Sequence, residues 1–139
     1  MRRSIAAAMM LLPLFQFPTL ANGDNISATG ESDYRTYCAS CHGREAKGDG
    51  PVAEFLALVP ADLTQLTKRN GGMFPGARVA EIIDGRALVK THGSRDMPVW
   101  GDWFKLEAGS PEIKDSTRES MVQSRIRGLA SYLQSIQEQ

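Results

Sequence analysis

Both cysteines of the chain and one of its two histidines lie within five consecutive positions, as Cys38, Cys41 and His42. Such a cluster is typical of three arrangements: a redox-active dithiol, part of a metal site, or a covalent attachment site for haem. In a helical turn, residues three and four positions apart are neighbours, so both thiols are predicted to project to one side with the imidazole beside them. Each arrangement needs a different surrounding fold, and the rest of the sequence discriminates among them.

The zinc and dithiol alternatives find little support elsewhere in the sequence. A structural zinc site takes about four Cys or His ligands, and His92 is the only further residue of either type. A thioredoxin-like dithiol lies in a β-α-β context, whereas this sequence has no alternating strand pattern. A structural disulfide between Cys38 and Cys41 would close only a very short loop. Because Cys-x-x-Cys-His is the attachment signature of c-type haem, we interpret the cluster as a haem site with His42 as an iron ligand.

The first 21 residues have the layout of a secretory signal peptide. A basic start (MRR) precedes a mostly apolar core (SIAAAMMLLPLF), and the small residues Thr19 and Ala21 precede a predicted cleavage site after Ala21. The apolar run from Ile5 to Leu12 is too short to span a bilayer, and no cysteine at the cut can carry a lipid. We therefore expect an exported, periplasmic protein without a stable membrane anchor, whose single haem domain covers residues 22–139.

The charge of the mature chain argues against nucleic acid as a partner. The sequence has 16 Lys and Arg against 16 Asp and Glu, and loss of Arg2 and Arg3 with the signal leaves 14 against 16, a formal balance of −2. No basic run survives in the mature chain, so no electrostatic footprint for a nucleic acid is present.

Apolar periodicity and capping residues predict an all-α domain of short helices and large loops. Residues 21–28 (ANGDNISA) have the composition of a loose leader, and a helix is expected over 29–41 with Thr29 as its N-cap. Further helices are expected over 63–69, 77–84 and 116–137. Asp62 should open the first of these, Gly85 should end the second, and a capping box of Ser116 and Glu119 should open the third. Residues 91–104 are expected to be irregular. So much loop in a small domain indicates loops that wrap a large apolar group.

The sixth ligand of a haem iron has few candidates in this chain. His92 would give bis-histidine ligation, and the methionines of the mature chain are Met73, Met97 and Met121. Met121 falls on the apolar stripe of the C-terminal helix, where core packing explains it, and Met73 lies in a glycine-rich turn. Met97 lies in irregular chain far from the attachment motif, and Pro98 stiffens the backbone after it. We expect Met97 to be the ligand, with His92 or an open site as alternatives.

Taken together, these motifs resemble a class I cytochrome c of the bacterial mono-haem type. CASCHG, GDGP and MPVWG occur in the order typical of that family, Gly30 and Tyr34 match its glycine-x3-aromatic pattern, and LASYL matches its C-terminal helix. The resemblance implies a small cytochrome c fold of short helices and long loops wrapped around one covalent haem c, bound through Cys38 and Cys41. It also implies that the Pro51 carbonyl accepts a hydrogen bond from His42.

A haem iron with histidine and methionine as axial ligands has no open position, so we expect outer-sphere electron transfer rather than enzymatic catalysis. The expected role is a soluble periplasmic carrier or the small haem subunit of an oxidoreductase. Redox proteins such as a respiratory complex, a terminal oxidase or a periplasmic dehydrogenase are the expected partners. Two alternatives stay open: a haem-based sensor with a displaceable sixth ligand, and a cofactor-free thiol oxidoreductase. Trp100, Arg78 and Arg86 are candidates to bind the haem propionates.

Overall fold

The computed structural model describes residues 22–86, 97–109 and 111–138. Within these ranges the chain forms helices joined by turns and loops, and no strand occurs in them. The α-helices of this described part are α1 (Asn22–Asp33), α2 (Ala39–His42), α3 (Leu66–Arg69), α4 (Gly76–Asp84), α5 (Trp100–Glu107) and α6 (Asp115–Ser135). Between them lie a π-helical turn, η1 (Tyr34–Cys38), and two 3-10 turns, η2 (Ala53–Phe55) and η3 (Leu63–Gln65). The predicted all-α class is confirmed.

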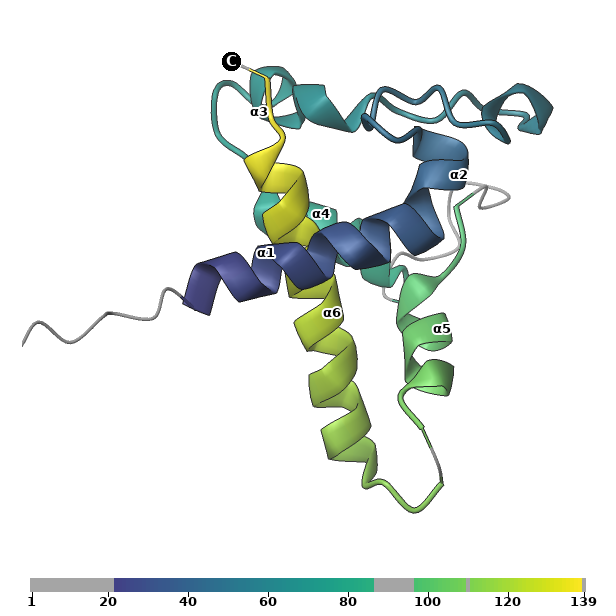
Figure 1. The fold of residues 1–139 in the computed structure, drawn as a ribbon, viewed down its shortest axis with the longest axis vertical. Helices are drawn as coiled ribbons and strands as arrows, with labels where there is room; N and C mark the ends of the chain where they lie inside the picture. Colours follow the sequence, from purple (N-terminus) through teal and green to yellow (C-terminus); the bar gives the residue numbers. More distant parts are fainter. Residues whose placement is uncertain (1–21, 87–96, 110, 139) are drawn as a thin grey trace, which may run out of the picture.

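The crossing of α1 over α6 organises the fold (Figure 1). At Gly30 the two helices approach so closely that a Cβ atom would lie 1.9 Å from the carbonyl oxygen of Gly128. Tyr34, Leu129 and Tyr132 are buried in the core beside the crossing, and the rings of the two tyrosines lie 5.2 Å apart.

Tyr34 links this crossing to the Cys-x-x-Cys-His turn. Its hydroxyl donates a 2.7 Å hydrogen bond to the carbonyl oxygen of Gly43, the residue that follows α2. Burial raises the pKa of this phenol well above its ordinary value, so the hydroxyl keeps its proton and remains a donor. Because η1 and α2 continue α1 without a loop, the helix crossing fixes the position of the whole motif.

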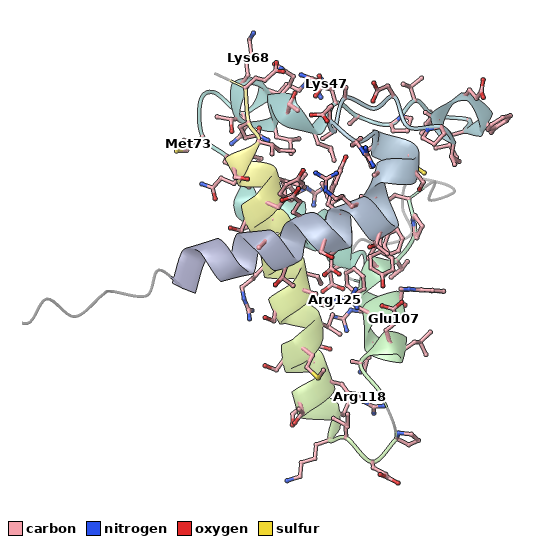
Figure 2. The ribbon with its side chains drawn as sticks, in the orientation of Figure 1. Lys47, Lys68, Met73, Glu107, Arg118 and Arg125 are labelled. Carbon is pink, nitrogen blue, oxygen red and sulfur yellow. The ribbon has the colours of Figure 1, made fainter. Side chains whose placement is uncertain are left out.

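Helix α5 packs against η1 through aromatic rings and against α6 through one arginine. The rings of Tyr37 and Phe104 meet edge to face with their centroids 5.5 Å apart. The guanidinium of Arg125, on α6, lies 4.0 Å from the centroid of the Phe104 ring. It binds Glu107 at 2.8 Å and Asp33 at 2.9 Å, and Figure 2 shows Arg125 and Glu107 between α6 and α5. One side chain of α6 thus connects the ends of α1 and α5.

Arg125→Met is expected to lower the free energy of unfolding by about 2 kcal/mol. The substitution keeps an apolar stem but leaves Asp33, whose side chain is only 15% exposed, without its cation. Chemical denaturation of the haem-loaded protein measures the change. Arg35→Met is the control, because Arg35 pairs with Glu31 on an exposed face and its loss should cost less than about 0.5 kcal/mol. Equal losses in both variants would contradict the role given to Arg125.

The predicted helix boundaries are confirmed around α3 and α4. Asp62 caps η3, since its side chain accepts a hydrogen bond from the Thr64 backbone N–H at 2.9 Å, and α3 follows directly. Gly85 ends α4 in the left-handed conformation, with φ of 72°. In the described parts of the chain, no helix is both long and apolar enough to cross a membrane.

The predictions were wrong in three other places. Helix α1 begins at Asn22, so residues 22–28 are helical and Thr29 lies inside a helix rather than capping one. Part of the segment 91–104, expected to be irregular, is helical because α5 starts at Trp100. Helix α6 begins after Lys114 with no side-chain cap. The capping box fails because Glu119, its second member, binds Arg86 at 2.7 Å instead.

Candidate functional site

Two adjoining cavities border the Cys-x-x-Cys-His turn, one toward the chain that leads into α5 and the other toward α4 and α6. Their volumes are about 200 and 210 Å³, and both are lined by Cys38, His42, Ala61 and Met97. The other lining residues are almost all apolar or aromatic: Tyr37, Cys41, Leu56, Leu58, Val59, Pro60, Pro98 and Trp100 in the first cavity, and Tyr34, Leu63, Leu66, Val79, Ile82, Ile83, Leu129 and Leu133 in the second. The two cavities together form an apolar space. Its sulfur and imidazole groups come from the Cys-x-x-Cys-His motif and from Met97.

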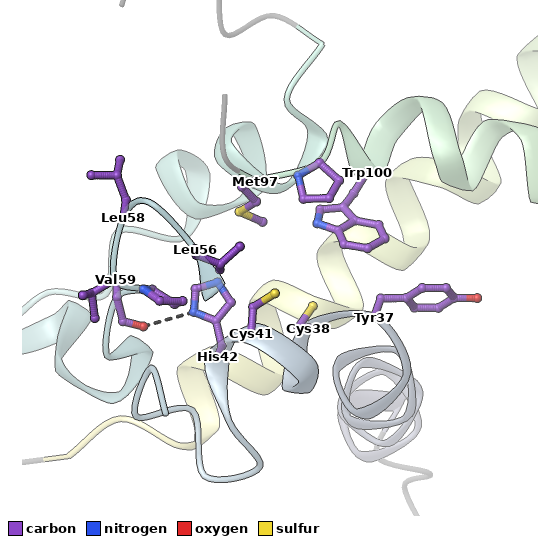
Figure 3. Close-up of a pocket in the computed structure, with 12 residues that line it drawn as sticks. Tyr37, Cys38, Cys41, His42, Leu56, Leu58, Val59, Met97 and Trp100 are labelled. Atoms are coloured by element: carbon purple, nitrogen blue, oxygen red, sulfur yellow. Dashed lines mark hydrogen bonds between the residues drawn. The ribbon is translucent and has the colours of Figure 1, made fainter. Parts of the chain in front are cut away.

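Both thiols of the motif point into the first cavity (Figure 3). Neither cysteine forms a disulfide. Burial, reinforced by the nearby Asp33 and Cys41, raises the pKa of the Cys38 thiol to about 12. Reactive dithiols instead need a cysteine with a lowered pKa, because the thiolate is the nucleophile. The surroundings of Cys38 therefore disfavour the thiol oxidoreductase alternative.

The His42 ring is oriented by a single backbone group. Its Nδ1 lies 3.1 Å from the carbonyl oxygen of Ala61 (dashed line in Figure 3). A carbonyl only accepts, so Nδ1 carries the proton and donates, which leaves the Nε2 lone pair available to a metal. Burial lowers the pKa of His42, although the hydrogen bond to Ala61 opposes the effect. The imidazole is thus held neutral and in the tautomer that an iron ligand requires.

The prediction that Pro51 accepts this hydrogen bond was wrong. Residues 50–52 instead fold back on the backbone of α2, where Gly50 N–H donates to the Cys41 carbonyl at 3.1 Å and Val52 N–H to the Ser40 carbonyl at 2.9 Å. This pairing keeps Pro51 at the surface, where it is exposed. Ala61 comes from the next loop and directly precedes the helix cap at Asp62, whose backbone is extended. The Ala61 carbonyl accepts the hydrogen bond from His42.

Met97 lies across the cavity from His42, with its sulfur facing the space between them (Figure 3). The competing methionines do not line either cavity. Met73 is 73% exposed and points outward (Figure 2), and Met121 is 44% exposed on α6 rather than packed in the core as expected. The other candidate, His92, lies outside the described residues.

The candidate propionate partners separate into two groups. Trp100 lines the first cavity. Arg78 is bound to Glu81 at 3.2 Å on an exposed face, and Arg86 is bound to Asp84 and Glu119. Neither arginine lines the two cavities. Trp103 is 51% exposed and donates to Glu107 at 2.8 Å.

The donor set fits a haem better than a bare metal ion. Two thiols facing one way can form two thioether bonds, and a neutral imidazole beside them can bind iron from the same side. Apolar walls suit a porphyrin, and a thioether sulfur faces the imidazole across the cavity. In the described residues, no three His, Cys, Asp or Glu side chains come together as a metal site would require.

Comparison with known proteins identifies one family. The sequence model of the family described as Cytochrome C oxidase, cbb3-type, subunit III matches residues 25–133. This range includes the Cys-x-x-Cys-His motif, Ala61, Met97 and most of α6. No curated protein and no solved structure gives a significant match. The match covers most of the chain and lies entirely inside the predicted haem domain.

Proposed function

The chain belongs to the family described as cytochrome c oxidase, cbb3-type, subunit III, and from this membership we propose that it transfers single electrons through a haem held by four residues. A c-type cytochrome domain carries covalent haem c and serves electron transfer rather than catalysis, and it has the small all-α cytochrome c fold. The proposal adds the residues: Cys38 and Cys41 form the thioether bonds, and His42 and Met97 bind the iron from opposite sides.

The observation that carries this proposal is the arrangement around the first cavity. Cys38, Cys41 and His42 border it on one side, and Met97 lies across from them. Met97 is more than fifty positions from the other three residues in the sequence, and the fold brings all four to one apolar space. Both axial positions of an iron between His42 and Met97 would be filled, which suits electron exchange through the edge of the group.

The residues of the chain have separate tasks in this mechanism. When bound, haem c supplies an iron that alternates between the ferric and ferrous states. The two cysteines keep the group attached in either state, and Ala61 fixes the tautomer and orientation of His42 and raises its basicity. The apolar residues of both cavities exclude water, which favours the less charged ferrous centre and raises the reduction potential.

The setting of this electron transfer is proposed from the N-terminal sequence and the family. Residues 1–21 act as a cleaved signal peptide, and residues 22–139 work in the periplasm as a carrier or as the small haem subunit of an oxidoreductase. Redox proteins are the partners, and a terminal oxidase is the kind that the family description suggests. A permanent subunit would co-purify with its partner, whereas a carrier would be isolated as a monomer with a polar rim.

Met97→Ala is the experiment that tests the axial ligands. The wild-type ferric protein should show the weak long-wavelength band of a sulfur-to-iron charge transfer, and the variant should lose it. Its reduction potential should fall, because the sulfur ligand favours the ferrous state, and its ferrous form should bind carbon monoxide. Met121→Ala is the matched control and should change none of these properties, since Met121 is exposed on α6.

Two results would redirect the proposal. A wild-type haem spectrum without the sulfur band would assign the sixth position to His92 or leave it open. Rapid carbon monoxide binding by the wild-type ferrous protein would favour the sensor alternative, because a sensor needs a sixth ligand that is easily displaced.

A further inference from the structure

A cluster of charged side chains lies where α4 ends and α5 begins. Arg86 binds both oxygens of Glu119, at 2.7 and 2.8 Å, and both oxygens of Asp84, at 2.5 and 2.9 Å. Gln123 donates to the same two carboxylates at 3.1 Å each. The side chains of Arg86 and Asp84 are only 25% and 20% exposed. These four residues, Asp84, Arg86, Glu119 and Gln123, are called the Arg86 cluster below.

Gly101, the second residue of α5, lies directly against the Arg86 cluster. A Cβ atom at this buried glycine would lie 2.1 Å from Oδ1 of Asp84 and 2.5 Å from Nε of Arg86. The backbone of α5 therefore contacts the ion pair itself, with no side chain between them. The cluster thus sets the point at which α5 begins.

Met97 belongs to the chain that this contact holds. It precedes Gly101 by four residues, and Trp100, between them, lines the same cavity as Met97. The stretch from Met97 to Gly101 is therefore held at its C-terminal end, by the contact of Gly101 with the Arg86 cluster.

Arg86 also keeps two negative charges together at this point. Its hydrogen bonds lower the pKa of Asp84 and lower the pKa of Glu119 to about 2, so both carboxylates are ionised at neutral pH. Without the cation, these like charges would face each other beside the first turn of α5. Their repulsion would displace that turn, and Met97 would move with it.

We infer that Arg86 is a positioning residue that holds Met97 at the sixth coordination position of the haem iron. The inference rests on the ligation by His42 and Met97 proposed above. It gives this arginine a task other than contact with the haem propionates, for which it was a candidate.

Imidazole binding to the ferric, haem-loaded protein tests this inference, because imidazole competes with Met97 for the iron. When the methionine occupies its position for less of the time, the apparent affinity for imidazole rises in proportion. Arg86→Gln and Gly101→Ala should each tighten imidazole binding on the order of tenfold and weaken the sulfur-to-iron band. Arg86→Lys keeps the charge but loses the paired geometry, so it should recover part of both properties.

Arg125→Met is the control for general loosening. Arg125 also holds two carboxylates, but it binds α5 at its last residue, Glu107. Its loss should change imidazole affinity by less than about twofold. Equal tightening in Arg125→Met and Arg86→Gln would overturn the inference, as would an unchanged affinity in Arg86→Gln.

Two further results keep the test decisive. If Arg86→Gln does not accumulate as folded protein, Arg86→Lys retains the positive charge but loses the paired geometry, and it should still tighten imidazole binding measurably. An unchanged affinity in that variant would also overturn the inference. Absence of the sulfur-to-iron band from the wild-type protein would refute Met97 as a ligand, and so would separate failure of the proposed function from failure of the inference.

Discussion

Replacing both Cys38 and Cys41 with alanine is expected to abolish covalent attachment of haem. Both thiols face the same cavity, and they are the only cysteines in the chain, so no other thiol can replace them. Denaturing gel electrophoresis followed by haem staining measures the effect. The wild-type band should stain and the double variant should not. The variant should also lose several kcal/mol of stability, since two apolar cavities would be left without their occupant.

The single variants and a neighbour provide the controls for this prediction. Cys38→Ala and Cys41→Ala should each keep one thioether bond, so each should still stain on the gel. Ser40→Ala changes an exposed residue inside the same motif and should leave staining and stability unchanged. Full staining of the double variant would show that the haem is attached elsewhere and would refute the proposed role of the two thiols.

Gly30→Ala is expected to lower the free energy of unfolding by about 3 kcal/mol or more. In an isolated helix the same change stabilises by about 1 kcal/mol, because alanine has the higher helix propensity. Here the new methyl group would lie 1.9 Å from the Gly128 carbonyl oxygen. The Gly128 oxygen belongs to the backbone and cannot move away without its helix. The two helices would therefore have to separate, which would open the core beside them. The clash therefore outweighs the gain in propensity.

Gly76→Ala is the matched control for the helix crossing. Gly76 is the first residue of α4, and the nearest atom to an added Cβ would be 3.5 Å away on the Phe74 ring. Its substitution should change the free energy of unfolding by less than about 1 kcal/mol, in the stabilising direction. Thermal or chemical unfolding of both haem-loaded variants provides the comparison. A loss at Gly76 as large as that at Gly30 would contradict the assignment of the cost to the crossing.

The features that the sequence predicted are those encoded locally. Cys38, Cys41 and His42 lie in one helical turn, so their spacing alone predicts that they share a side. Gly30 and Tyr34 match a family pattern. The structure explains the glycine of that pattern, because the close approach of α1 and α6 leaves no room for a Cβ atom at position 30. The caps at Asp62 and Gly85 also depend only on neighbouring residues, and both are confirmed.

The features that the sequence did not predict depend on contacts between distant segments. The partner of His42 is Ala61 rather than Pro51 because residues 50–52 hydrogen-bond to α2, and no spacing rule reveals which loop folds back. The start of α5 at Trp100 follows from packing against the Arg86 cluster and the ring of Tyr37. Glu119 has the position of a capping residue, yet an arginine thirty-three positions away binds it more favourably.

The close contact of Gly30 with Gly128 also constrains the order in which the protein can be assembled. These residues lie 98 positions apart in the sequence, so α1 gains its partner only after α6 has been synthesised. Contacts of such long sequence separation form late and slow folding. Until then, the Cys-x-x-Cys-His turn that continues α1 has no core to pack against. If haem is attached as proposed, the thiols stay accessible to it until the two helices close, and the crossing then fixes the position of the turn.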